Sequence, residues 1–177
     1  MNMKRTSAAA IITGALAVLS SWAVVAQDKY ALKIPDGLAF SEFKGYETWQ
    51  VVSLSHSDDT LNVIVANPVM INAYAAGIPG NGKPFPDGAR SAKLQYIPKK
   101  STEAPFSVSV PDRLKDVAFM AKDSKRFVSS GGWGYGVFNY DPKSDSFSPE
   151  GKGASCGFAC HTRVKAKDYV FTELGKR

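Results

Sequence analysis

The chain has 177 residues, with 22 lysines and arginines against 16 acidic residues and a formal net charge of +6. This length suits one domain with a sizeable core. The basic residues are scattered, apart from small clusters at Lys99–Lys100 and Arg163–Lys167, so the charge indicates a solvated surface and excludes the concentrated basic face of a nucleic-acid-binding protein.

The N-terminus predicts export. A basic start with Lys4 and Arg5 precedes the apolar run TSAAAIITGALAVLSSWAVVA, which ends in small residues at Ala26. These are the regions of a secretory signal peptide at residues 1–26. The alternative is an uncleaved anchor helix, because the run approaches spanning length, but its Gly, Ser and Thr content favours removal. Residues 27–177 then form one domain with no membrane segment and, without Lys4 and Arg5, a formal charge of +4.

The first part of the mature chain predicts a short helix and a hairpin. Ser41–Trp49 begins with a capping residue and indicates a short helix. Residues 49–57 and 61–67 are rich in β-branched side chains and indicate strands. The Ser, Asp and Thr residues of 57–60 supply the turn between them.

A helix follows, with both of its ends marked. Asn67 suits the N-cap, Pro68 the first helical position and Gly77 the stop. Residues 78–88 are too rich in Gly and Pro for anything but a loop.

The remaining chain predicts mainly strands. We expect strands at 89–97, 106–110 and 116–123, an aromatic strand within 124–141 after a helical turn and a Gly bend, and a surface loop at 141–155. Strands separated by turns predominate over helices. The predicted fold class is therefore α+β, mostly β, with an antiparallel sheet and a few packed helices.

Both cysteines and one of the two histidines lie in the stretch CGFACH, residues 156–161. Zinc would need two more ligands, and a thioredoxin-like site has C-x-x-C spacing. A disulfide gives the neighbouring histidine no role. Covalent haem attachment uses all three residues, with Cys156 and Cys160 bonded to the vinyl groups and His161 to the iron. The usual motif, C-x-x-C-H, is one residue shorter, and the additional residue is expected to bulge out of a loop.

The C-terminal half resembles the cytochrome P-460 family. The matching motifs are K-D-S-x-R-F at 122–127, G-x-W-x-x-x-x-F-x-Y at 131–140, the cysteine pair with its histidine, and K-D-x-V-F-T at 167–172; residues 72–93 resemble the family's middle segment. The resemblance implies a mostly β, often dimeric, periplasmic protein with one haem c on the sheet. Members oxidise hydroxylamine, or couple it with nitric oxide, and pass electrons to a periplasmic acceptor. Related c′-beta cytochromes bind nitric oxide without that turnover.

The resemblance also implies a haem cross-link. Members with hydroxylamine activity carry a bond from a lysine nitrogen to a meso carbon of the porphyrin, and Lys93 has the family's spacing after Asp87-Gly88. On a strand, Lys93 shares one face with Ser91 and Gln95. By pattern alone this polar stripe faces solvent, and the resemblance favours the alternative that it lines a haem cavity.

A second family position departs from the pattern. Active members place a carboxylate, acting as proton acceptor, where this chain has Ala118. Asp116 lies two residues earlier on the same face of the strand, about 7 Å away. It is a substitute proton acceptor or a surface residue.

The sixth position on the iron is expected to be open. The candidate ligands are His56, Met70 and Met120, and each suits an ordinary surface or packing role. The candidate distal wall residues are Phe40, Phe43, Phe106 and Phe119. The leading hypothesis is a monohaem oxidoreductase for hydroxylamine or nitric oxide; the alternatives are a non-catalytic nitric oxide binder and an electron-transfer cytochrome.

Overall fold

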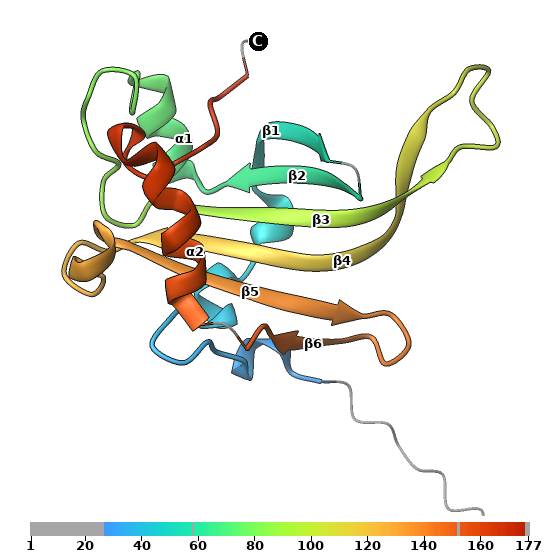
Figure 1. Ribbon diagram of the computed structural model, residues 1–177, viewed down its shortest axis with the longest axis horizontal. Coiled ribbons are helices and arrows are strands. Elements are labelled where there is room, and N and C mark those ends of the chain that lie inside the picture. Colours follow the sequence, from blue (N-terminus) through green and yellow to red (C-terminus); the bar gives the residue numbers. More distant parts are fainter. Residues whose placement is uncertain (1–26, 58, 152, 176–177) are drawn as a thin grey trace, which may run out of the picture.

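Six antiparallel strands form one sheet, in the same order across the sheet as along the chain. The computed structural model describes residues 27–57, 59–151 and 153–175. The strands are β1 (Gln50–Ser57), β2 (Thr60–Ala66), β3 (Arg90–Lys100), β4 (Ser109–Lys122), β5 (Trp133–Asp141) and β6 (Ser146–Pro149). Figure 1 shows this sheet with helical segments around it. The mostly β, antiparallel fold is therefore confirmed, whereas the predicted signal peptide lies outside the described residues.

Two α-helices accompany the sheet: α1 (Pro68–Ala75) and α2 (Gly153–His161). The predicted cap of α1 is confirmed, because the Asn67 side chain accepts a hydrogen bond from the Met70 backbone at 3.0 Å. Among the described residues there are also five short 3-10 helices: η1 (Lys29–Ala31), η2 (Phe40–Phe43), η3 (Tyr46–Thr48), η4 (Val128–Ser130) and η5 (Thr162–Lys167). The continuous helix expected at 41–49 is wrong, because Gly45, at φ 84°, separates η2 from η3.

The β3–β4 hairpin is longer than predicted and extends beyond the rest of the sheet (Figure 1). Pro98 lies opposite Pro111, where the register shifts. Proline is tolerated at such irregularities because it has no N–H to offer a regular ladder. The prediction of a surface loop over 141–155 is wrong in part, because β6 pairs with β5 through Phe147 opposite Tyr140.

One face of the sheet packs against the N-terminal segment. Phe40 and Phe43 of that segment meet Phe119 and Phe138 of the sheet, and all four are fully buried. The Phe43 and Phe119 rings stack at 4.0 Å. Glycine at 134 lets this segment approach closely, because a Cβ there would lie 2.9 Å from the Leu38 side chain.

The opposite face carries α2, which crosses in front of the sheet in Figure 1, together with the C-terminal segment. A second core lies here, formed around Trp133 and Tyr135 of β5, Met70 of α1, Phe85 and Val170. None of the described helices is both long enough and apolar enough to cross a membrane. The two faces of the sheet therefore differ: one is a closed aromatic core, and the other holds the cysteine motif.

Candidate functional site

The cysteine motif is part of a regular helix. α2 runs from Gly153 to His161 and contains both cysteines, four residues apart. Residues at this spacing lie on the same helix face, with Cβ atoms about 5–6 Å apart. The expected loop bulge is wrong, because the helix accommodates the additional residue within its own turn.

A close crossing with β5 sets the position of α2. A Cβ on Gly157 would lie 2.7 Å from the Tyr135 Cβ, so only glycine permits this approach. The helix therefore rests on Tyr135 through the residue that follows Cys156.

A cavity of about 440 Å³ lies between α2, the C-terminal segment and the sheet. Cys156, Cys160 and His161 line it from the helix side. The sheet side is partly polar and contributes Ser55, Asn62, Ser91, Lys93, Ala118, Met120 and Tyr135. The volume is in the range of small-molecule and cofactor sites. The structure thus brings the three residues of the motif together with the strand residue Lys93.

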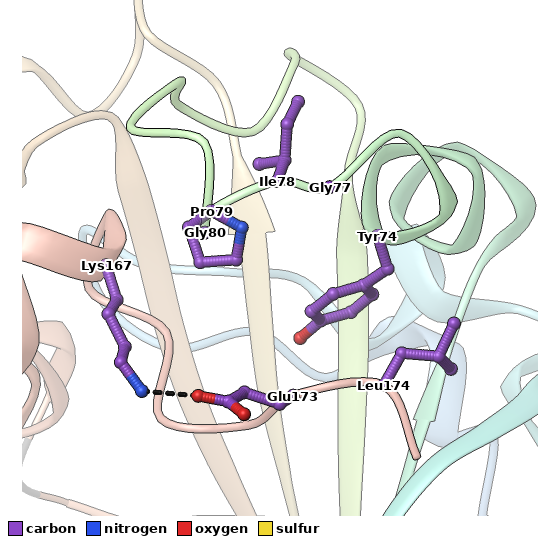
Figure 2. Close-up of a pocket in the computed structure, with 8 residues that line it drawn as sticks. All are labelled: Tyr74, Gly77, Ile78, Pro79, Gly80, Lys167, Glu173 and Leu174. Carbon is purple, nitrogen blue, oxygen red and sulfur yellow. Dashed lines mark hydrogen bonds and ion pairs between the residues drawn. The ribbon is translucent and has the colours of Figure 1, made fainter. Parts of the chain in front are cut away.

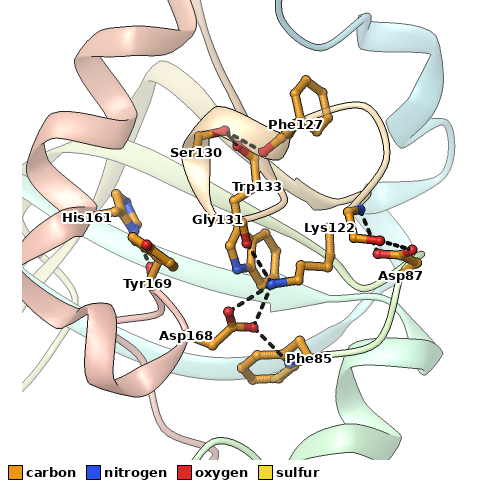
Figure 3. A network of polar contacts seen from close by, with 11 residues as sticks. Phe85, Asp87, Lys122, Phe127, Ser130, Gly131, Trp133, His161, Asp168 and Tyr169 are labelled. Carbon is orange, nitrogen blue, oxygen red and sulfur yellow. Dashed lines mark hydrogen bonds and ion pairs between the residues drawn. The ribbon is translucent and has the colours of Figure 1, made fainter. Parts of the chain in front are cut away.

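The tautomer of His161 is fixed by the backbone. Its Nδ1 lies 2.6 Å from the Tyr169 carbonyl oxygen (Figure 3). Because a carbonyl only accepts, Nδ1 donates its proton and Nε2 keeps a lone pair for a metal ion. Burial lowers the pKa of His161; the hydrogen bond to the Tyr169 carbonyl opposes this shift and the charge of Lys93 adds to it, so on balance the neutral imidazole is favoured. The rings of Tyr135 and Phe171 flank it at 5.0 and 4.8 Å.

Lys93 faces the cavity and is half-buried, so the solvent-facing alternative for its stripe is wrong. Burial lowers the pKa of the Lys93 amine, while the charge of Asp116 opposes that shift. A lowered pKa raises the fraction of neutral, nucleophilic amine at a given pH.

Position 118, where a carboxylate is expected from the family pattern, and the acidic residues near the site differ in their access to the cavity. Ala118 lines the cavity, directly opposite Lys93 in the β3–β4 register. Asp116 is 4% exposed, accepts a hydrogen bond from Gln95, and has a pKa raised by burial. It is therefore a buried residue, not a surface one. Glu150 lines the cavity as well. Sequence reasoning missed Glu150 because it follows β6, which was taken as loop.

The other candidates from the sequence fall into two groups. Met120 and Phe119 border the cavity, whereas His56 is exposed and Met70 is fully buried in the second core. No aromatic wall candidate places its ring in the cavity: the rings of Phe40, Phe43 and Phe119 pack together in the core on the opposite face of the sheet, and Phe106 is 71% exposed.

The zinc and disulfide alternatives find no geometric support in the described residues. Cys156 and Cys160 are both free, exposed thiols. Nowhere in residues 27–57, 59–151 and 153–175 do three or more His, Cys, Asp or Glu side chains gather as a metal-ion site.

A family model for cytochrome P460 matches residues 43–172, most of the chain, and the chain therefore belongs to this family. A search of curated proteins finds no match. Membership implies a haem cofactor. The residues present suit that group: two thiols one helical turn apart, an imidazole with its Nε2 lone pair available, and a cavity that all three line.

Proposed function

From membership of the cytochrome P460 family, we propose that this protein is a monohaem c-type cytochrome with an open distal iron position. Cys156 and Cys160 would form thioethers with the haem, and His161 would be its protein ligand. The observation that carries this proposal is the convergence of these three side chains on one cavity. The covalent form of haem requires assembly outside the cytoplasm, so the protein would be exported and periplasmic, in keeping with the signal peptide predicted at residues 1–26.

The substrate we propose is hydroxylamine, nitric oxide or both. A five-coordinate haem iron supplies an open position for such a ligand and a route for electrons to a periplasmic acceptor. Ser91 and Asn62, which are buried polar residues on the cavity wall, suit hydroxylamine, which donates and accepts hydrogen bonds, better than an apolar ligand.

Lys93 would be joined to the haem through a bond from its Nζ to a meso carbon: the neutral amine would lose one proton, the meso carbon would lose its hydrogen as a second proton, and a two-electron oxidant of the peroxide class would take up the two electrons. Two observations support this role: the side chain lines the same cavity as the cysteines, and burial favours its neutral amine. Without the bond, Lys93 would be a free amine on the cavity wall.

A second candidate function is nitric oxide binding without turnover, as in the c′-beta cytochromes. The observation that favours it is Ala118, which stands on the cavity wall where active members carry a carboxylate. An electron-transfer cytochrome would need a sixth protein ligand, and Met120 is the ligand candidate from the sequence that lines the cavity.

The purified haem protein tests the proposal directly. Haem should remain with the protein through acid-acetone extraction, and the pyridine haemochrome spectrum should report whether two thioethers or one are present. The Cys156→Ala and Cys160→Ala variants should each lose one thioether. A ferrous protein that is low-spin and six-coordinate without added ligand would refute the open position and favour the electron-transfer function. Release of the haem into acid-acetone would refute covalent attachment.

A further inference from the structure

A buried ion pair lies behind the C-terminal segment of the site, away from the cavity. Lys122, at the end of β4, places its Nζ 2.8 and 3.0 Å from the two carboxylate oxygens of Asp168 (Figure 3). The two side chains are only 7% and 11% exposed. The same Nζ donates to the Gly131 carbonyl at 2.9 Å, and the Phe85 N–H donates to Asp168 at 2.8 Å. Three distant parts of the chain, at residues 85, 122–131 and 168, therefore meet at one carboxylate–ammonium contact.

Fold stability alone is a weak reason for such a pair. Removing two charges from water costs free energy that their attraction often fails to recover, so well-packed apolar replacements are frequently neutral or stabilising. The best-attested use of a buried pair is to fix one arrangement of the chain among several. The segment that this pair fixes is the turn after η5.

That turn has an unfavourable backbone. Asp168 and Tyr169 have φ angles of 49° and 63°, in the left-handed region that residues other than glycine rarely occupy. Two successive residues of this kind persist only where their surroundings hold them. The Asp168 side chain restrains the turn, because it forms an ion pair with Lys122 and accepts a hydrogen bond from the Phe85 N–H.

The next residue connects this turn to the site. The carbonyl of Tyr169 accepts the hydrogen bond from His161 Nδ1, and Asp168 is the residue immediately before it. Packing keeps the Tyr169 ring in place as well, because a Cβ on Gly131 would lie 2.2 Å from that ring. Gly131 thus touches Tyr169 and, through its carbonyl, Lys122.

We propose that the Lys122–Asp168 pair positions the proximal histidine: it holds the Asp168–Tyr169 turn so that the Tyr169 carbonyl meets His161 Nδ1. Lys122 and Asp168 are positioning residues, because neither touches the haem cavity. Their effect on the iron passes through the strength and direction of one hydrogen bond, which sets how strongly the imidazole donates. This inference rests on the proposed role of His161 as iron ligand.

The test uses the holoprotein and two variants. Lys122→Met with Asp168→Asn removes both charges together, so no unpaired charge is left buried, and asparagine tolerates the left-handed backbone. Asp168→Asn alone is the second variant. A weaker Nδ1 hydrogen bond makes the imidazole a poorer donor, so the iron–histidine stretching band in ferrous resonance Raman spectra should move to lower frequency. The preference for ferric over ferrous iron should fall on the order of tenfold, which is about 59 mV for a one-electron couple, towards positive potential.

The matched control is Lys167→Gln. Lys167 precedes Asp168 in sequence but pairs with Glu173 in an exposed contact (Figure 2), with side chains 48% and 73% exposed. The control should leave the stretching band and the potential unchanged. A folded double variant with a wild-type band and potential would overturn the proposal. Failure of the double variant to fold would overturn it too, because the pair would then serve the fold itself. Absence of an iron–histidine band from the wild type would instead refute the ligand role of His161.

Discussion

If the protein oxidises hydroxylamine as proposed, Ala118→Glu should raise the rate of that oxidation. Ala118 lines the cavity beside the residues of the cysteine motif, so a longer side chain at this position would extend into the proposed haem site and not into the closed core. Converting hydroxylamine to product requires the loss of several protons. A carboxylate placed on the cavity wall would receive them, and position 118 is where active relatives carry one.

The magnitude depends on Lys93, the register partner of Ala118 across the β3–β4 ladder. A positioned base contributes about 100- to 10,000-fold to rate. If Lys93 is a free cation, directly opposed side chains lie about 4.5–5.5 Å apart at Cβ, and its charge would lower the pKa of the new carboxyl and weaken it as a base. If Lys93 is bonded to the haem, its charge is lost and burial raises that pKa. We therefore expect a gain of about 100-fold with a free Lys93, and a larger gain with a cross-linked one.

Steady-state oxidation of hydroxylamine with a dye acceptor measures the effect. Wild type should be slow, Ala118→Glu fast, and Asp116→Asn and Glu150→Gln close to wild type. A fast wild type that is slowed by Asp116→Asn or by Glu150→Gln would refute the reasoning, since that acid would already accept the proton. If no protein in the series turns over hydroxylamine while all bind nitric oxide tightly, the nitric oxide-binding function stands in place of the enzyme.

Three further predictions concern the sheet. Lys93→Arg should abolish the cross-link, because a guanidinium keeps the charge but lacks the nucleophilic amine; mass spectrometry of a digest should find the Lys93 peptide joined to the haem peptide only in wild type, and a free wild-type peptide at full yield would exclude the bond. Burial raises the pKa of Asp116 above its usual 3.8, so the folded protein binds the proton of this carboxyl more tightly than the unfolded chain does. The free energy of unfolding therefore falls as the pH rises from 3.8 through the higher pKa of the folded protein. Asp116→Asn should therefore be more stable than wild type at pH 7 and lose this advantage below pH 3.8, as followed by urea unfolding; an equal difference at both pH values would contradict the linkage. Phe119→Ala should lower the free energy of unfolding by about 3–5 kcal/mol, whereas the exposed Phe106→Ala should change it by less than about 0.5 kcal/mol.

The parts of the fold that the sequence predicted are those with local signals. The β1–β2 hairpin followed from β-branched strands around a polar turn, and α1 from its cap at Asn67. β6 was missed because Ser146–Pro149 is short and contains turn-forming residues, and its strand state depends on pairing with β5. Similarly, β3 and β4 continue past Pro98 and Pro111 because the hairpin accommodates both prolines at one irregularity.

In the site, too, the residues with a local sequence signal were predicted and those that depend on tertiary contacts were not. Cys156, Cys160 and His161 are adjacent in sequence, so their chemistry was visible there. The direction of the Ser91–Lys93 stripe was not, because alternation tells which residues share a face but not what covers that face. The Lys122–Asp168 contact joins residues 46 positions apart and carries no local signal at all.

The unusual cysteine spacing has a simple consequence in this fold. On a helix, residues three and four positions apart both lie on the same face. Lengthening C-x-x-C-H by one residue therefore rotates the first cysteine by about 100° around the helix axis, without removing it from the side of the helix that faces the cavity. The adjacency of Cys160 and His161 at the end of α2 is unaffected. The change is confined to Cys156, which still lines the cavity. If only one thioether forms, it should be the one to Cys160, because that sulfur keeps its usual relation to the histidine.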